Sequence, residues 1–320
     1  RVFQVIGNIP VTLNGLTAQN GDAGSGDGGG IFAAAITLVD VRIRNNTTTG
    51  RGAGLSVVNG AVITGSLFEG NTTTNYGGGV YNFSGGEVHI TNTQLISNTA
   101  GDGGGLMFDG GTGPSTLENV QLFNNSAVAG GGLASYAGTT IVRNSLFQNN
   151  HATGGSGGGM YAFYDMEVMN VRFVANSATG NGGGVSQVNL FEPKLGAITN
   201  SLFADNQAGS GAAIYSNGNI TVTHATIGGS APLPNQAIFF DGWSAGSMTV
   251  RNSIIANHAV GLMKDGTGPL QEDANLFADN TTNLAGAVTS GGNSLTGVAG
   301  FVDPPTNDYR LSQNSVAIDA

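Results

Sequence analysis

The chain has 320 residues, a formal net charge of −10 and no cysteine, and only 9% of its residues are charged. The acidic balance argues against a nucleic-acid partner, because binding to phosphates needs basic patches that 10 scattered Lys and Arg do not supply. The absence of cysteine removes disulfide bonds as a source of stability. No apolar run reaches the length of a transmembrane helix, so we expect no direct insertion into a membrane.

One sequence unit recurs along most of the chain. In the copy at 102–125, three glycines precede Leu106, and alternating apolar residues then lead to Asn125. Copies follow one another at intervals of roughly 22 to 30 residues, a period typical of solenoids. The apolar position after the small-residue triad is held by Ile31, Leu55, Val80, Leu106, Leu133, Met160, Val185 and Ile214, with Ile238 in a degenerate copy.

The composition of the repeat favours strands over helices. Glycine inside a helix costs about 0.8 to 1 kcal/mol relative to alanine, and the Val, Ile, Thr and Phe of the repeats favour strands. Stacked coils let each strand pair in parallel with its equivalent about 4.8 Å away. We therefore predict an all-β fold, a single-stranded right-handed parallel β-helix, or β-solenoid, of about 10 to 13 coils of roughly 25 residues. Residues 1–282 form the repeats, and 283–320 form an irregular closing segment of the same domain.

A polar residue closes each copy. A closing Asn can bond to turn backbone and to its equivalents in the neighbouring coils, as amide ladders do in stacked strands. Later copies drift and close on Ser230, His258 and Asn280. The sequence therefore predicts a structural asparagine ladder of Asn46, Asn71, Asn98, Asn125, Asn150, Asn176 and Asn206.

The triads and the closing residues together resemble a known family. Gly77-Gly78-Gly79-Val80 and Gly103-Gly104-Gly105-Leu106, paired with Phe68-x-x-Asn71, Phe147-x-x-Asn150, Phe173-x-x-Asn176 and Phe203-x-x-Asn206, resemble the GGA[ILV] and FxxN repeats of polymorphic outer membrane proteins. Those are bacterial surface β-helix proteins, and several act as adhesins. The end of the chain, from Tyr309 to Asp319, is similar to the closing segment of secreted bacterial β-helix proteins. The resemblance implies an extracellular or bacterial cell-surface location.

Catalytic and metal-binding chemistry is sparse in the sequence. A polysaccharide lyase needs carboxylates clustered around calcium with a basic partner, and a glycoside hydrolase needs a close carboxylate group. The nearest candidates are Asp165 with Glu167 and Glu272 with Asp273, without a basic partner in a neighbouring copy. Arg143 and Arg172 lie near equivalent positions of adjacent repeats. No His pair has metal-ligand spacing. We expect no catalytic residues, no metal and no cofactor, with a β-helix lyase or hydrolase as the alternative.

The residue after each apolar position should point outward by strand alternation. Exposed aromatic rings there could stack on sugar rings or dock a partner, or they could pack on one another and stabilise the rod. This column contains Phe32, Tyr81, Met107, Tyr161, Tyr215 and Phe239. Its aromatic members, Phe32, Tyr81, Tyr161, Tyr215 and Phe239, are the candidate binding residues. Threonines at 47–49 and 72–74 align as in an ice-binding array, but the next copies do not continue it.

These observations predict a non-enzymatic, extracellular, structural or adhesive module. Neither end of the chain resembles a finished terminus, and bare end coils would expose unpaired strand edges. We therefore expect either a larger surface protein or self-association, head to tail, into filaments. A glycan is a possible partner. An ice- or glycan-binding module is the second alternative.

Overall fold

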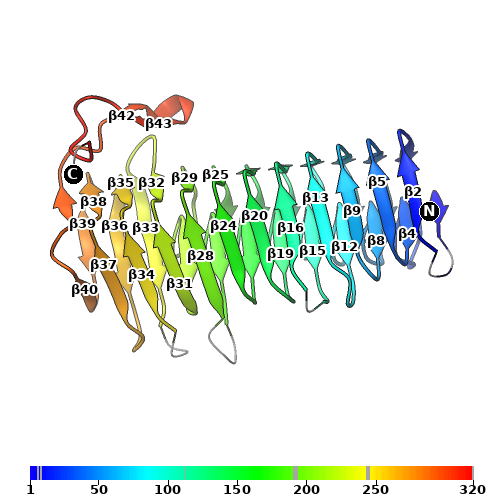
Figure 1. The fold of residues 1–320 in the computed structure, drawn as a ribbon, viewed down its shortest axis with the longest axis horizontal. Coiled ribbons are helices and arrows are strands. Elements are labelled where there is room, and N and C mark those ends of the chain that lie inside the picture. The colour runs from blue at the N-terminus through cyan, green and yellow to red at the C-terminus, as the bar shows by residue number, and fades with distance from the viewer. Residues whose placement is uncertain (6, 8, 112, 190–193, 243–245, 319–320) are drawn as a thin grey trace.

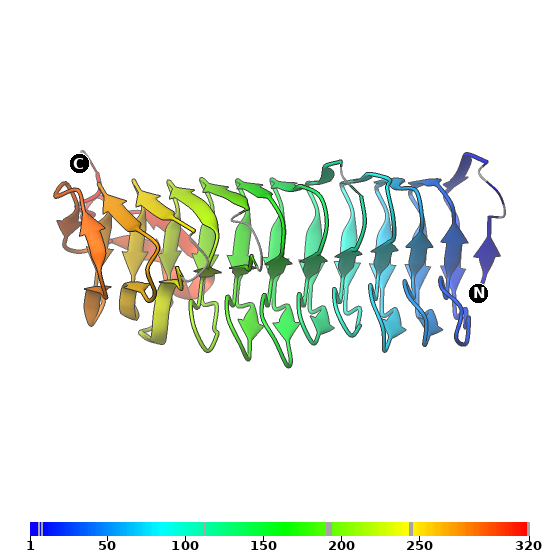
Figure 2. The same ribbon diagram turned by 90° about the horizontal axis from the view of Figure 1, so that it is seen from below.

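The computed structural model describes residues 1–5, 7, 9–111, 113–189, 194–242 and 246–318. Its strands wind into a straight parallel β-solenoid of about 11 turns, with about 25 residues per coil (Figure 1). Successive coils stack side by side and contribute strands to three long parallel sheets, each of 12 strands (Figure 2). The described residues contain no α-helix. The predicted all-β β-solenoid is therefore confirmed.

Sheet A carries the apolar residue that follows each glycine triad. Its strands in spatial order are β1 (Phe3–Gln4), β4 (Ile31–Ala33), β8 (Leu55–Val57), β12 (Val80–Asn82), β15 (Leu106–Phe108), β19 (Leu133–Ser135), β23 (Met160–Ala162), β27 (Val185–Gln187), β30 (Ile214–Ser216), β33 (Leu233–Phe240), β36 (His258–Lys264) and β39 (Thr282–Ala285).

Sheet B follows sheet A in each coil. Its strands are β2 (Val11–Asn14), β5 (Ile36–Val39), β9 (Ala61–Thr64), β13 (Val88–Thr91), β16 (Ser115–Glu118), β20 (Thr140–Arg143), β24 (Met166–Met169), β28 (Leu195–Thr199), β31 (Asn219–Thr223), β34 (Met248–Arg251), β37 (Leu270–Asp273) and β40 (Val288–Ser290).

Sheet C ends just before the closing residue of each coil. Its strands are β3 (Thr17–Gln19), β6 (Arg42–Arg44), β10 (Leu67–Glu69), β14 (Gln94–Ile96), β17 (Gln121–Phe123), β21 (Leu146–Gln148), β25 (Arg172–Val174), β29 (Leu202–Ala204), β32 (Thr226–Gly228), β35 (Ile254–Ala256), β38 (Leu276–Ala278) and β41 (Leu295–Thr296). Short strands follow in some coils: β7 (Thr47–Thr48) pairs with β11 (Thr72–Thr73), and β18 (Ser126–Ala127), β22 (His151–Ala152) and β26 (Ser177–Ala178) form a small sheet.

The core is a stack of like side chains inside the coils. Strand alternation points every second residue inward, and equivalent residues of successive coils lie in register. The phenylalanines of the FxxN motifs are buried there, and the ring of Phe173 stacks on those of Phe147 and Phe203 at 4.8 and 4.9 Å between centroids. The apolar register of the repeat therefore forms the interior of the solenoid.

Each coil bends where the backbone enters the left-handed region. One bend separates sheets B and C, as at Asn92 (φ 50°) and Asn119 (φ 55°), and another follows sheet C, as at Asn124 (φ 53°). Asparagine tolerates this conformation better than other non-glycine residues, which explains its abundance outside the ladder. The glycine triads require glycine itself. Gly103 adopts φ 63°, and a Cβ on Gly104 would collide with the carbonyl oxygen of Gly131 in the next coil.

The closing segment begins later than predicted. Strands β39, β40 and β41 still pair with β36, β37 and β38, so regular coils extend through Thr296 rather than ending near 282. Leu284 and Val288 keep the core contacts of a coil, although this copy lacks the glycine triad. Then β42 (Phe301–Asp303), the 3-10 helix η1 (Pro304–Thr306) and β43 (Asp308–Leu311) form an antiparallel hairpin. Asp319 of the predicted closing motif lies outside the described residues.

The hairpin folds back along the outside of the rod over sheet C (Figure 1). Tyr309 packs against Val174 and Ala204, and Phe301 lies at the edge of this cluster. The outer row of sheet C becomes small beneath the closing segment, where it reads Val174, Ala204, Gly228, Ala256 and Ala278. These small side chains make room for the hairpin.

Candidate functional site

The predicted ladder residues form a continuous chain of buried amides. The Nδ2 of Asn98 donates to Asn125 Oδ1 at 3.0 Å and to the carbonyl oxygen of Phe68 at 3.0 Å. The same Asn125 Oδ1 accepts the backbone N–H of Asn98 at 3.0 Å. Each rung therefore joins the coil before it and the coil after it. The pattern repeats at Asn46, Asn71, Asn98, Asn125, Asn150 and Asn176 and ends on Asn206.

A second ladder of hydroxyl groups lies at the corner between sheets B and C. The Oγ of Ser66 accepts the backbone N–H of Val41 at 3.1 Å and donates to the carbonyl oxygen of Thr64 at 3.0 Å. Thr93 makes the same pair of bonds, accepting from Ser66 N–H at 3.2 Å. Sequence analysis gave Ser66 and Thr93 no role. The available signal was that serine and threonine share one column with valine, as in Val41, Ser66, Thr93 and Val120.

The predicted aromatic column exists on the outer face of sheet A. The registers pair Tyr81 with Met107, and Tyr215 with Phe239. The expected exposure is wrong for three members, because Tyr81 and Met107 are fully buried and Tyr215 is only 6% exposed. Phe32, Tyr161 and Phe239 are half-buried. For Tyr81, the reason is that residues from the turns on either side of its strand cover the ring.

One cluster shows how the covering works. The ring of Tyr81 lies 6.2 Å from both Tyr76 and Phe83, nearly parallel to each. The guanidinium of Arg51, from the preceding coil, stacks on all three rings at 5.3 to 6.0 Å. Met107 packs against Tyr81 from the following coil. Cations held over aromatic faces stabilise such clusters, and the faces of Tyr81 are therefore not open to a sugar ring. Phe83 remains 45% exposed.

Carboxylates fix the tyrosine hydroxyls of this face. Tyr81 donates to Asp109 at 2.8 Å, Tyr136 to Asp102 at 2.9 Å, and Tyr215 to Asp241 at 2.7 Å. Tyr161 meets Tyr136 and Phe163 edge-on at 5.9 and 5.0 Å. Burial, followed by the charge of Asp102, raises the pKa of Tyr161 to about 12. Burial is also the main cause of the raised pKa of Tyr81, Tyr136 and Tyr215, with their carboxylate partners adding to it.

Two clefts lie on the corner between sheets B and C, and we call the surface strip that carries both of them the corner groove. It consists of the corner column (Asp40, Gly65, Asn92, Asn119, Asn144, Asn170, Asn200 and His224) and the first residues of the sheet C strands (Thr17, Arg42, Leu67, Gln94, Gln121, Leu146, Arg172, Leu202 and Thr226). A cleft of about 800 Å³ lies at its N-terminal part, between Gly15 and Gln121. A second cleft of about 730 Å³ lies where the hairpin covers its C-terminal part.

Amide groups line the groove in hydrogen-bonded steps. The Nδ2 of Asn200 donates to Asn170 Oδ1 at 2.6 Å, and that of Asn170 donates to Asn144 Oδ1 at 3.1 Å. The Nε2 of Gln94 donates to Gln121 Oε1 at 3.0 Å. The corner column therefore presents an amide in each of the successive coils from Asn92 to Asn200, whereas the first residue of the sheet C strand varies between glutamine, leucine and arginine.

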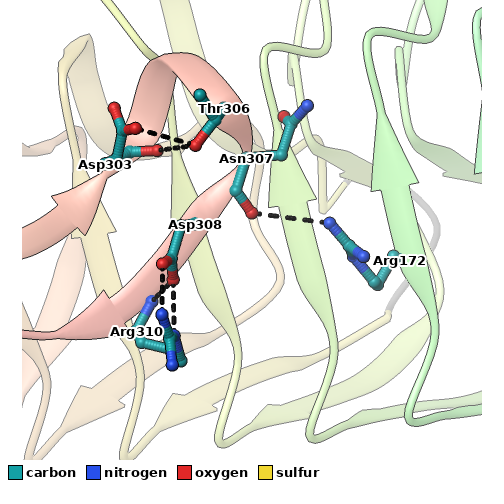
Figure 3. A network of polar contacts seen from close by, with 6 residues as sticks. All are labelled: Arg172, Asp303, Thr306, Asn307, Asp308 and Arg310. Atoms are coloured by element: carbon teal, nitrogen blue, oxygen red, sulfur yellow. Dashed lines mark hydrogen bonds and ion pairs between the residues drawn. The ribbon is translucent and has the colours of Figure 1, made fainter.

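The hairpin closes one end of the groove through a small polar network (Figure 3). Arg172 extends from β25 toward the hairpin, and its Nη2 donates to the carbonyl oxygen of Asn307 at 3.4 Å. Arg310 makes a two-pronged ion pair with Asp308, at 2.8 and 2.6 Å. This hydrogen-bonded pairing lowers the pKa of Asp308 to about 2. Thr306 bonds back to Asp303 at 2.9 Å.

The carboxylates weighed for catalysis are separated and engaged. Glu167 does have a basic partner in the neighbouring coil, contrary to expectation, since Arg143 Nη2 lies 2.8 Å from its Oε1. Arg143 ends a sheet B strand whereas Arg172 begins a sheet C strand, so the two are not equivalent. Glu272 is buried and accepts from Asn275 at 3.0 Å. Among the described residues, no three His, Cys, Asp or Glu side chains gather in a metal-binding group.

Two further columns bear on the sequence expectations. The outward column that holds Thr47, Thr72 and Thr99 continues as Ser126, His151, Ser177 and Gln207. His258 takes the closing position of its coil, where its backbone N–H donates to Asn280 Oδ1 at 3.0 Å. Burial lowers the pKa of His258 to about 4.

The model of the Chlamydia polymorphic membrane protein repeat matches residues 65–82. This segment contains a Phe68-x-x-Asn71 motif and the triad before Val80. With the parallel β-solenoid, the match confirms the resemblance to polymorphic-membrane-protein-like β-helix repeats and fits a surface β-helix protein. No curated protein and no solved structure matches the chain. Within the described residues, none of the helical segments has the length and apolar character that would let it cross a membrane.

Proposed function

We propose that the chain is a non-enzymatic structural and adhesive module outside a bacterial cell, at the cell surface or in the extracellular space. The observation that carries this proposal is the unbroken stacking of coils: each long sheet runs through 12 parallel strands, and buried asparagines link the coils from Asn46 to Asn206. Stacked repeats of this kind form rigid, elongated bodies with extended binding surfaces. The matched surface-protein repeat at 65–82 supports the location.

The sides of the rod suit adhesion through many weak polar contacts. Only 9% of the residues are charged, and the corner groove offers amide side chains along successive coils. Amides both donate and accept hydrogen bonds, so a regular array of them can contact a regular partner. Many individually weak contacts on one rigid body add up to avidity when the partner is also repetitive.

The rival class, a glycan lyase or hydrolase, draws less support from the side-chain contacts. Glu167 is paired with Arg143, and the Oδ1 of Asp165 accepts the backbone N–H of Leu195 at 2.7 Å. Ice binding draws little support from a column in which serine, histidine and glutamine follow the threonines.

A bead assay tests the adhesive function. Beads coated with the purified chain are incubated with epithelial cell monolayers and with abiotic surfaces, and retained beads are counted after washing. We expect at least tenfold more retained beads than with albumin-coated controls on the cells. Equal retention of both bead types on every surface would refute adhesion and leave only a spacer role.

A further inference from the structure

We propose that the corner groove binds an acidic glycan chain lengthwise, with Arg172 holding a sugar carboxylate beneath the C-terminal hairpin. The inference deepens the adhesive function proposed above by naming its ligand class and its site. It rests on the shape of the groove, on its amide lining and on the long hydrogen bond that Arg172 makes to the hairpin.

The shape fits a chain rather than a compact molecule. Both clefts lie on the same two columns of the coils, one around Arg42 and the other around Arg172. Five strand spacings separate β6 from β25 in sheet C, which corresponds to about 24 Å at the usual 4.8 Å per strand. Clefts of about 800 and 730 Å³ fall within the range of small-ligand sites. A polymer of several units spans such a distance.

The lining suits hydroxyl groups. An amide side chain has two N–H donors and one oxygen acceptor, and each corner asparagine uses only part of this capacity in the bonds between coils. Asn119 and Asn200 are exposed to solvent. Sugar hydroxyls both donate and accept, so they can replace the water that now solvates these amides.

Arg172 supplies the charge. Its guanidinium carries five N–H donors, and its bond to the backbone oxygen of Asn307 is long, at 3.4 Å. Arg310 is already engaged by both oxygens of Asp308. Arg172 can therefore make a two-pronged bond to a carboxylate, the geometry that arginine favours. The nearby charge of Asp308 disfavours a dianionic phosphate more than a singly charged carboxylate.

The proposed site lies under the hairpin, next to Arg172. Arg172 projects from the sheet toward the loop that carries Asn307, so a ligand in the cleft would lie between sheet and hairpin (Figure 3). His224 and Thr226, two coils beyond Arg172, line the same cleft. A neutral sugar would find hydroxyl partners here but would leave the guanidinium without an anionic one.

Calorimetric titration tests the inference. The probes are galacturonate, mannuronate and hyaluronan oligosaccharides, the methyl ester of the galacturonate oligomer, and inorganic phosphate. We expect at least one acidic oligosaccharide to bind, at least tenfold tighter than phosphate, and the ester to bind at least tenfold more weakly than its acid. Arg172→Gln should lose at least tenfold in affinity, whereas Arg143→Gln, a matched change outside the groove, should not. A thermal melt verifies that both variants fold.

Three outcomes would overturn the inference: no binding of any acidic oligosaccharide, equal binding of acid and ester, or unchanged affinity in a folded Arg172→Gln variant. The bead assay separates this failure from failure of the adhesive function. If beads coated with the Arg172→Gln variant adhere as well as wild-type beads, the adhesive function stands and this binding site is refuted. If wild-type beads do not adhere, the adhesive function itself is refuted.

Discussion

Replacing Asn125 with alanine should cost about 5 kcal/mol of unfolding free energy, because it leaves a buried N–H unsatisfied and removes three further hydrogen bonds. Asn125 Oδ1 accepts the backbone N–H and the Nδ2 of Asn98, both at 3.0 Å, and its Nδ2 donates to the oxygens of Leu95 and Asn150 at 2.9 Å. All of these groups are buried, so no water replaces the lost partner. An unsatisfied buried N–H costs about 1 to 3 kcal/mol, and each of the other lost bonds costs about 1 kcal/mol.

Equilibrium unfolding in guanidinium chloride, followed by circular dichroism, measures this loss. The matched control is Asn119→Gly, which removes an exposed asparagine and keeps the left-handed corner at φ 55°. Because its bond to Asn92 is long, at 3.3 Å, and exposed, we expect a change within about 1 kcal/mol. A loss below about 1 kcal/mol for Asn125→Ala, or equal losses in both variants, would refute the structural role of the ladder.

Three other measurements probe the remaining features. Arg51→Ala should remove the cation stacked on Tyr76, Tyr81 and Phe83, lowering stability by about 1 to 2 kcal/mol and changing the near-ultraviolet dichroism of the tyrosines, whereas an unchanged spectrum would contradict the stacking. Because burial lowers the pKa of His258 from 6.5 to about 4, its neutral form stabilises the fold fully above pH 6.5, and that stability falls as pH drops toward 4. His258→Asn should therefore flatten stability against pH in this window, and an identical slope in both proteins would argue against it. If copies stack head to tail, light scattering across a concentration series should show mass increasing in steps of 32.1 kDa, whereas a constant monomer mass would exclude the filament.

The repeat register predicted the interior of the rod well because it depends on local alternation. Val80 points inward and Tyr81 outward, as a two-residue period requires. Burial of Tyr81 was not predictable in this way, because Tyr76, Phe83 and Arg51 reach it from turns and from another coil. The direction in which a side chain points is set by its own strand, whereas its exposure to solvent depends on the neighbouring turns.

Asparagine has two roles in the coils, and sequence reasoning predicted only one of them, the ladder. Asn125 is a buried rung, while Asn124 beside it adopts φ 53° at the bend after sheet C. The packing of the hairpin on the rod could not be predicted from the repeat, because Arg172 and Asn307 are 135 positions apart and no period links them. The small residues Ala204 and Gly228 on the outer row were the only local sign of that contact.

Cysteine labelling on intact bacteria tests most directly the claim that this solenoid is a surface module. The natural chain has no cysteine, so Thr72→Cys and Thr73→Cys each introduce a single thiol in β11. Thr72 is exposed and Thr73 is only 3% exposed. With a membrane-impermeant maleimide, we predict rapid labelling at position 72 and little at position 73 on whole cells. Equal labelling of both would contradict the coil geometry, and labelling of position 72 only after lysis would contradict surface display.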